Sequence, residues 1–226
     1  MESSLRALAR SQGPVLTDYT RGERVELNAP VVARWVAKVA DLVLEETGGD
    51  HATVALCLPP SWRTVVWALG AVAAGAQVRC PSAASPSGLA DAVAALPQEP
   101  AVLVSDAALA APLADLCLVQ PMPALALYAH DVPPGWIDAG ADLMGRPDSL
   151  PPLGPPGTLE GAPLSEGGGV GAGGRFLLPT EGDWLKRACE IVLAGGSVVL
   201  VEAGLPQAEV ARLCQAERAQ LAAAPR

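Results

Sequence analysis

The sequence predicts an α/β fold with a mainly parallel, doubly wound sheet, helices on both of its faces and an N-terminal β-hairpin. Short β-branched runs alternate with helical patterns over residues 12–128 and again over residues 175–226, as in strand–helix–strand units. Thr53–Leu58 is apolar at every position but the first, which is typical of a strand buried on both faces. Half of the 226 residues are hydrophobic, which is enough for a substantial core.

The hairpin and the first long helix follow from turn and capping residues. Two short strands, Val15–Tyr19 and Arg24–Leu27, flank a turn that contains Gly22. Asn28 is placed to cap the next helix, and Pro30 lies in its first turn, where its missing N–H costs little.

The remaining elements follow from hydrophobic periodicity and from Gly and Pro breaks. After the central strand we expect, in order, a helix Ser61–Ala74, a strand Gln77–Cys80, a helix Gly88–Ala95, a strand Ala101–Ser105, a helix Ala107–Leu116 and a strand Leu125–Tyr128. The last part predicts a strand Arg175–Leu178, a helix that begins at a capping box of Thr180 and Asp183 and ends at Gly195, a strand Ser197–Val201 and a helix from Pro206 to about Glu217. Two strands alone rarely stand as a domain, so we expect residues 1–226 to form a single α/β domain.

Residues 131–174 form the most unusual segment of the sequence. They contain 20 Gly or Pro in 44 positions, which predicts a long exposed connection without regular structure. Its glycine run, residues 167–174, invites comparison with a phosphate-binding loop. No lysine lies in or beside the run, and the charge of Glu166 would oppose a phosphate, so a linker is the better interpretation.

Charge and hydropathy exclude several classes of partner. The net charge is −9, the isoelectric point is about 4.7, and only Lys38 and Lys186 join thirteen scattered arginines. This balance argues against nucleic acid and against anionic membranes as partners. The longest uncharged apolar stretch, Thr64–Val78, is shorter than the roughly 18–20 residues that cross a bilayer, and no secretory signal is visible, so we expect a cytoplasmic protein.

The cysteines and histidines predict neither a metal site nor a catalytic nucleophile. There is no CxxC pair, and the two histidines have no Ser, Cys or carboxylate at a suggestive spacing. We therefore expect no bound metal, no cofactor and no catalytic residue, with the cysteines acting as reduced, buried small hydrophobes. The five cysteines are Cys57, Cys80, Cys117, Cys189 and Cys214.

Candidate ligand-binding residues come from the carboxyl ends of the expected strands, where open parallel sheets bind ligands. This rule selects Ser61 and Trp62 after the central strand and Ser105 after the next strand. The expected helix N-terminus at Ser61 is placed to accept an anion. The alternative is that Ser61 is only a helix cap and Trp62 only a packing residue.

Several short motifs resemble the N-terminal region of AMP-dependent acyl-CoA synthetases, the adenylate-forming ligases. They are Gly49-Asp50, Val54–Leu56, Leu58-Pro59, Leu69–Ala71 and Ala74–Ala76. Val25–Leu27 with Arg34–Lys38 resembles, more specifically, an uncharacterised actinobacterial family that looks like a shortened member of that superfamily. Arg175–Pro179 with Leu193–Leu200 is similar to the ligase segment after the phosphate loop. The resemblance implies the fold of the ligase N-terminal domain.

The departures from the ligase pattern bear most on function. The resemblance places a loop ending in Pro-Lys, which grips the ATP phosphates, between Asp106 and Arg175, where this sequence has its Pro/Gly-rich segment. Leu178-Pro179 is followed by Thr180 where the ligases usually carry His, and their later Thr-Glu motif, adenosine-binding Asp and catalytic Lys have no counterpart. No functional residue of the family carries over.

These departures predict a non-catalytic, truncated homologue that serves as a binding scaffold for a small molecule or a protein. Two alternatives stay open. One is an adenylate-forming acyl-CoA ligase that another chain completes, and the other is a protein-interaction module that uses residues 131–174.

Overall fold

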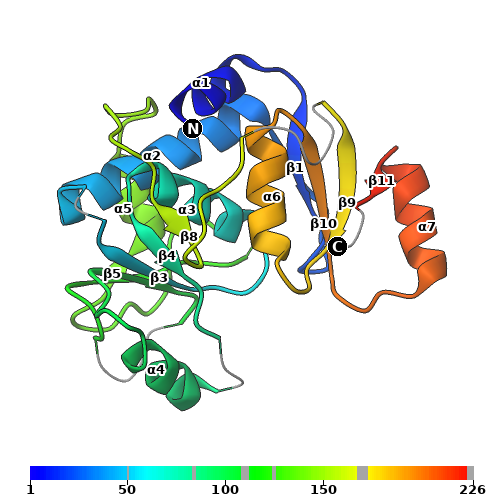
Figure 1. Cartoon of the computed structure of the whole chain (residues 1–226). Coiled ribbons are helices and arrows are strands. Elements are labelled where there is room, and N and C mark those ends of the chain that lie inside the picture. Colours follow the sequence, from blue (N-terminus) through cyan, green and yellow to red (C-terminus); the bar gives the residue numbers. More distant parts are fainter. Residues whose placement is uncertain (50, 83–84, 108–111, 124–125, 167–172, 223–226) are drawn as a thin grey trace. The chain divides into compact units, whose positions relative to one another are not determined.

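The chain forms two compact units, each with a β-sheet of its own (Figure 1). The structure is a computed structural model that describes residues 1–49, 51–82, 85–107, 112–123, 126–166 and 173–222. Unit 1 comprises Met1–Ala33, Pro60–Val65 and Leu164–Arg226, and unit 2 comprises Arg34–Pro59 and Val66–Pro163. The chain passes between the units several times, so no single cut separates them, and the single-domain assignment stays a prediction.

Sheet A, in unit 1, has the strand order β11-β9-β10-β1-β2. Its strands are β1 (Pro14–Asp18), β2 (Val25–Asn28), β9 (Arg175–Pro179), β10 (Ser197–Val201) and β11 (Gln220–Leu221). β1 and β2 pair antiparallel and the turn residue Gly22 has φ +77°, which confirms the predicted hairpin. All other pairs in sheet A are parallel.

The strands of residues 175–226 do not extend the sheet built around Thr53–Leu58. β10 pairs with β1 through Leu16 opposite Val198, so the C-terminal strands gain their partner from the N-terminal hairpin. Alternation along β9 and β10 places Leu177 and Val199 on one face, where they pack with Leu213 of α7 (Gln207–Ala216).

Two further helices belong to unit 1. α6 (Trp184–Leu193) contacts β9 and β10, and α1 (Glu2–Arg10) contacts α6. α1 and β11 were not expected from the sequence. The signal for α1 was the pair Leu5 and Leu8, three residues apart and both buried, in an otherwise polar segment.

Sheet B, in unit 2, is parallel throughout and has the strand order β7-β6-β5-β3-β4-β8. Its strands are β3 (Thr53–Cys57), β4 (Gln77–Arg79), β5 (Val102–Ser105), β6 (Leu116–Val119), β7 (Ile137–Asp138) and β8 (Thr158–Leu159). β3 lies between β4 and β5 and is buried along its whole length, which confirms the predicted central strand.

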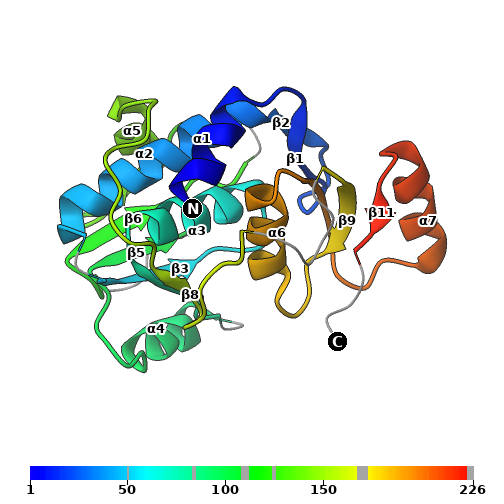
Figure 2. The same cartoon turned by 45° about the horizontal axis from the view of Figure 1, so that its top comes forward.

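Helices cover both faces of sheet B, as Figure 2 shows for α4 on one side and for α2 and α3 on the other. α4 (Pro86–Ala94) contributes Val93 to a buried cluster that includes Ala55, Leu103 and Trp136. The other helices are α2 (Ala29–Thr47), α3 (Trp62–Ala73) and α5 (Ala139–Gly145). The mixed α/β class with a mainly parallel sheet is therefore confirmed.

Within unit 2, α2 and α3 approach closely at Gly70. A Cβ atom at Gly70 would lie 2.6 Å from the Cβ of Val39 and 2.9 Å from the carbonyl oxygen of Val36. Only a residue without a side chain allows this approach, which explains the glycine in a helix that is apolar from Val65 onwards. At the start of α2, the side chain of Asn28 accepts a hydrogen bond from the N–H of Val31 at 3.1 Å, which confirms the predicted cap.

Two predicted elements after β5 are wrong. Residue 107 and residues 112–115 are not helical, and Leu116, the expected last residue of that helix, begins strand β6 (Leu116–Val119). Residues 108–111 and 124–125 lie outside the described residues, and Ala126–Tyr128 forms no strand. The alanine-rich approach to Leu116 favoured a helix locally, whereas pairing with β5 decided the structure.

The prediction of an exposed, irregular connection over residues 131–174 is also wrong for the part that the structure describes. This part contains β7, α5 and β8, and it buries Trp136, Leu143 and Leu159. The glycine run itself falls mostly on residues 167–172, outside the described residues. The predicted capping box is not formed either, because Asp183 is the N-cap of α6 without a side-chain hydrogen bond.

Candidate functional site

Ser61 is the N-cap of α3 and belongs to unit 1. Its hydroxyl oxygen accepts a hydrogen bond from the N–H of Thr64 at 3.3 Å and lies 3.0 Å from the hydroxyl of Thr64. Ser61 is 1% exposed. The side chain therefore serves the helix end, as the capping interpretation of this residue requires.

The carboxylate of Asp18 occupies the N-terminus of α3. Its Oδ2 accepts a hydrogen bond from the N–H of Trp62 at 2.8 Å, and its Oδ1 accepts from the backbone N–H of Thr20 at 2.8 Å. The hydroxyl of Thr20 lies 2.7 Å from Oδ1 and 2.8 Å from the carbonyl oxygen of Pro60. The anion that we expected at this helix end is thus supplied by the chain itself.

Asp18 was missed because its helix partner lies 44 residues away in the sequence. The available signal was the spacing of Asp18 and Thr20 directly after a strand, which is typical of a turn in which the side chain accepts from the backbone two residues on. Such a turn holds the carboxylate rigidly. Asp18 is only 4% exposed, so its charge is compensated by these donors and by the helix dipole.

Trp62 packs against a buried arginine. The guanidinium carbon of Arg63 lies 4.3 Å from the ring centroid of Trp62, at cation–π distance, and both residues are nearly buried. Burial lowers the pKa of Arg63 to about 10. Trp62 therefore packs against a neighbouring residue of the first turn of α3, in agreement with its interpretation as a packing residue.

Ser105 ends β5 and lies in unit 2, so the structure places it in a different unit from Ser61 and Trp62. Its hydroxyl oxygen accepts a hydrogen bond from the N–H of Ala107 at 3.4 Å, and its carbonyl accepts from the N–H of Gln120 at 2.8 Å. Ser105 is fully buried and pairs in register with Cys57 and Val119. The observed hydrogen bonds of Ser105 therefore stabilise the turn at the end of β5.

Two thiols lie at the carboxyl ends of neighbouring strands in unit 2. Burial raises the pKa of Cys57 to about 12, with a smaller contribution from Asp106. Burial and the carboxylate of Glu160 raise the pKa of Cys80, whose backbone N–H also donates to that carboxylate. Both thiols stay protonated at neutral pH. All five cysteines are free, as the sequence predicts, but Cys80 and Cys214 are only half-buried, against the prediction that all five are buried.

The residues that the structure describes hold neither a candidate metal site nor a candidate membrane span. Among those residues, no group of three His, Cys, Asp or Glu side chains is placed to hold a metal ion. Within the same residues, no helix is both long and apolar enough to cross a bilayer.

Two cations of unit 2, Lys38 and Arg146, are held by carboxylates. The ammonium group of Lys38 lies 2.9 Å from a carboxylate oxygen of Asp148 and also donates to the carbonyl of Arg146. Arg146 in turn contacts Asp142 at 3.0 Å and Asp41 at 3.3 Å, and it forms a third ion pair with Glu45. These pairs fix α5 to α2 and neutralise both positive charges.

A second charged cluster ties the C-terminal part of unit 1 to sheet A. Glu217 accepts hydrogen bonds from Arg24, Tyr19 and Arg175, and its side chain is 7% exposed. The hydrogen bond from Arg24, followed by those from Tyr19 and Arg175, lowers the pKa of Glu217 to about 2, against an opposing effect of burial.

Replacing Glu217 with Gln is expected to remove an acid-dependent part of the stability. Because the pKa is depressed in the folded protein, this stability is fully present above the ordinary pKa of 4.5 and is lost as the pH falls towards about 2. The expected loss in the wild type is about 2–3 kcal/mol across that window. Urea unfolding at pH 7, 4 and 3 measures it. Equal pH slopes for wild type and Glu217→Gln would contradict the assignment.

The fold of this chain is shared with several solved structures. Solved structures with the same fold are acyl-CoA synthetases and adenylation domains. A Brucella canis acyl-CoA synthetase matches 96% of this chain with a TM-score of 0.70 and 13% identity. The N-terminal subdomain of Klebsiella oxytoca NpsA in complex with 3-hydroxyanthranilyl-AMSN matches 97% with a TM-score of 0.66 and 12% identity. The inhibitor-bound N-terminal domain of FACL13 from Mycobacterium tuberculosis matches 96% with a TM-score of 0.64 and 16% identity.

A curated relative adds a local sequence match. A TIGR03089 family protein of Mycobacterium tuberculosis is 41% identical over 69 residues, which cover 27% of this chain and 28% of that protein. No protein-family model matches the chain. The chain spans 46%, 59% and 60% of the three solved structures. The predicted resemblance to the N-terminal domains of acyl-CoA synthetases is thus confirmed at the level of the fold.

Proposed function

We propose that this chain is a binding scaffold with the N-terminal-domain fold of acyl-CoA synthetases and has no adenylation activity of its own. Adenylyl transfer depends on positioning and on positive charge that stabilises the phosphate oxygens in the transition state. The proposal therefore rests on where the positive charges of this chain lie.

One observation carries the proposal: both lysines have carboxylate neighbours, and neither lies in a loop. Lys38, in α2, is paired with Asp148, and Lys186, in α6, lies 4.0 Å from Glu190. Between Asp106 and Arg175, where the resemblance would place a phosphate loop, the sequence has a single Arg or Lys, Arg146. Its guanidinium contacts three carboxylates. These ion pairs support the proposal that the chain lacks a positively charged loop that would bind the phosphates of ATP.

The choice of ligand class is supported by the solved neighbours. Two of them contain a small molecule, 3-hydroxyanthranilyl-AMSN in NpsA and an inhibitor in FACL13. A scaffold with this fold would take a small organic molecule or a protein as its partner. The net charge of −9 argues against nucleic acid and anionic membranes as partners.

Calorimetric titration with ATP and Mg²⁺, combined with a pyrophosphate-release assay, tests the proposal. Addition of a panel of aliphatic and aromatic carboxylic acids is expected to release no pyrophosphate above the blank, and ATP is expected to show no binding at micromolar concentration. An active acyl-CoA synthetase serves as the positive control. Micromolar ATP binding together with acid-dependent pyrophosphate release would refute the proposal.

A second candidate is an acyl-CoA ligase that another chain completes. It is favoured by the chain spanning 46% of the solved Brucella canis synthetase and 59% and 60% of the two solved N-terminal domains. Affinity purification of the tagged chain, followed by the same pyrophosphate assay on the purified material, separates the two. Activity that requires a co-purified chain supports this candidate, and a lone inactive monomer counts against it.

The third function considered, an interaction module built on residues 131–174, has less support. Trp136, Leu143 and Leu159 in this segment are buried, so they are not available to a partner. Limited proteolysis tests it, because a recognition segment would become protected when the partner is added.

A further inference from the structure

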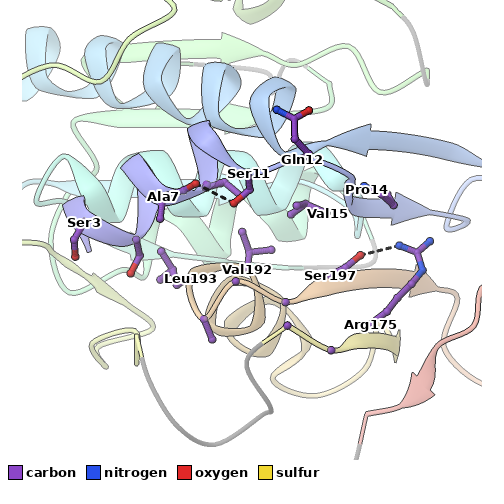
Figure 3. Close-up of a pocket in the computed structure, with 17 residues that line it drawn as sticks. Ser3, Ala7, Ser11, Gln12, Pro14, Val15, Arg175, Val192, Leu193 and Ser197 are labelled. Carbon is purple, nitrogen blue, oxygen red and sulfur yellow. Dashed lines mark hydrogen bonds between the residues drawn. The ribbon is translucent and has the colours of Figure 1, made fainter.

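A cavity lies within unit 1 at the amino ends of β9 and β10. Its volume is about 590 Å³, which falls in the range of small-molecule sites. Figure 3 shows Ala7 of α1 and Ser11, the C-cap residue that follows α1, on one side and Val192 and Leu193 of α6 on the other. Ligands of parallel sheets normally bind at the carboxyl ends of the strands, so this cavity is a different location from the one that the sequence rule selected.

The polar end of the cavity is preorganised. The guanidinium of Arg175 donates from Nη1 to the hydroxyl oxygen of Ser197 at 2.7 Å, from Nε to the carbonyl of Glu217 at 2.9 Å, and from Nη2 to the hydroxyl of Thr17 at 2.9 Å. These bonds fix the side chain before any ligand arrives, which reduces the entropy cost of binding.

The charge of Arg175 is already neutralised. It forms ion pairs with Glu217 and, at 3.7 Å, with Glu26. Arg175 is the one ionisable side chain in the described wall of the cavity. An anionic ligand would therefore find little net positive charge, and a cationic ligand would find no carboxylate in the described wall.

The wall offers both donors and acceptors of hydrogen bonds. Ser3 and Ser197 contribute hydroxyl groups that can donate as well as accept, whereas the hydroxyl of Ser11 already donates to the carbonyl of Ala7 at 2.9 Å and is left as an acceptor. Leu193 and Ala194 belong to the C-terminal end of α6, where the last carbonyls of a helix have no partner inside it. A ligand that both donates and accepts suits such a wall.

The rest of the wall is apolar and small. Leu8, Val15 and Val192 contribute aliphatic surface beside the hydroxyl groups. The combination of aliphatic surface, hydroxyls and carbonyls matches a ring that carries hydroxyl groups at its rim and C–H groups on its faces. We propose that this cavity binds a neutral, hydroxyl-rich molecule of the size of a hexose. This inference stands apart from the proposed function, because it depends on no adenylation chemistry.

Saturation-transfer NMR titrations with glucose, glucuronate and glucosamine test the ligand class, since the three share a ring and differ in charge. Glucose is expected to bind saturably with a dissociation constant on the order of millimolar. Glucuronate and glucosamine are expected to bind at least about fivefold more weakly. No saturable binding of glucose, or tighter binding of either charged analogue, would overturn the proposal.

Two tryptophan variants on one helix test the location. Ala7 is exposed and lines the cavity, whereas Ala9 is exposed on the same helix outside the lining. Ala7→Trp is expected to fill the cavity and weaken glucose binding by about tenfold or more, and Ala9→Trp is expected to leave it unchanged. Equal glucose binding by the two variants would place the site elsewhere and overturn the proposal. If Ala7→Trp fails to fold by circular dichroism, Ser3→Trp, also exposed and lining, takes its place.

Discussion

Replacing Gly157 with Ala is expected to lower the free energy of unfolding by about 3 kcal/mol or more. A Cβ atom at this position would lie 1.8 Å from the carbonyl oxygen of Ala76 and 2.6 Å from the carbonyl carbon of Gly75. Both obstacles are backbone, so no side-chain rotation relieves the clash. Gly157 also donates its N–H to the carbonyl of Val72 at 2.8 Å, which holds the approach to β8 against α3.

Gly154→Ala is the matched control, three residues earlier in the same segment. A Cβ atom at Gly154 would meet nothing within 4 Å, so this change is expected to alter stability by no more than about 0.5 kcal/mol. Urea unfolding of both variants measures the difference. Two variants of equal stability would show that the segment before β8 does not pack as described.

Asp18→Ala is expected to cost about 2–4 kcal/mol. The change removes the acceptor for the N–H of Trp62 at the start of α3 and the acceptor for the N–H of Thr20. Asp18 is only 4% exposed, so water does not readily replace its carboxylate as the acceptor for these two N–H groups. Asp18→Asn keeps the shape but loses one acceptor and the charge, and it is expected to recover part of the loss.

Asp183→Ala supplies the control for this capping effect. Asp183 is also an N-cap, of α6, but its side chain makes no cap hydrogen bond, so about 0.5 kcal/mol or less is expected. Chemical denaturation of the three variants under one condition gives the comparison. A loss for Asp18→Ala no larger than that for Asp183→Ala would rule out the internal anion at α3.

Elements with their own local signals could be predicted from the sequence. The uninterrupted apolar run Val54–Leu58 marked the central strand, and Asn28 with Pro30 marked the start of α2. Signals of this kind act over a few residues, so they do not depend on the rest of the fold. The resemblance to ligase N-terminal domains rested on such short motifs and proved correct for the fold.

Features decided by distant partners could not be predicted. Leu116–Val119 became a strand because β5 offered an edge, although the residues before it are rich in alanine. The buried residues of 131–166 fall in a segment whose Gly and Pro content favours loops. Ser61 was correctly recognised as a cap, but the carboxylate that fills the helix end comes from Asp18, far away in the sequence.

The central position of β10 in sheet A has a consequence for synthesis of the chain. Every strand of sheet B lies between Thr53 and Leu159, so unit 2 has all its strands once that stretch has left the ribosome. β1 lacks its parallel neighbour until Val201 has emerged, and a lone two-stranded hairpin is marginal in water. The N-terminal hairpin is therefore expected to become stable only after the C-terminal strands have been synthesised. Co-translational folding is expected to begin with unit 2, in the middle of the chain.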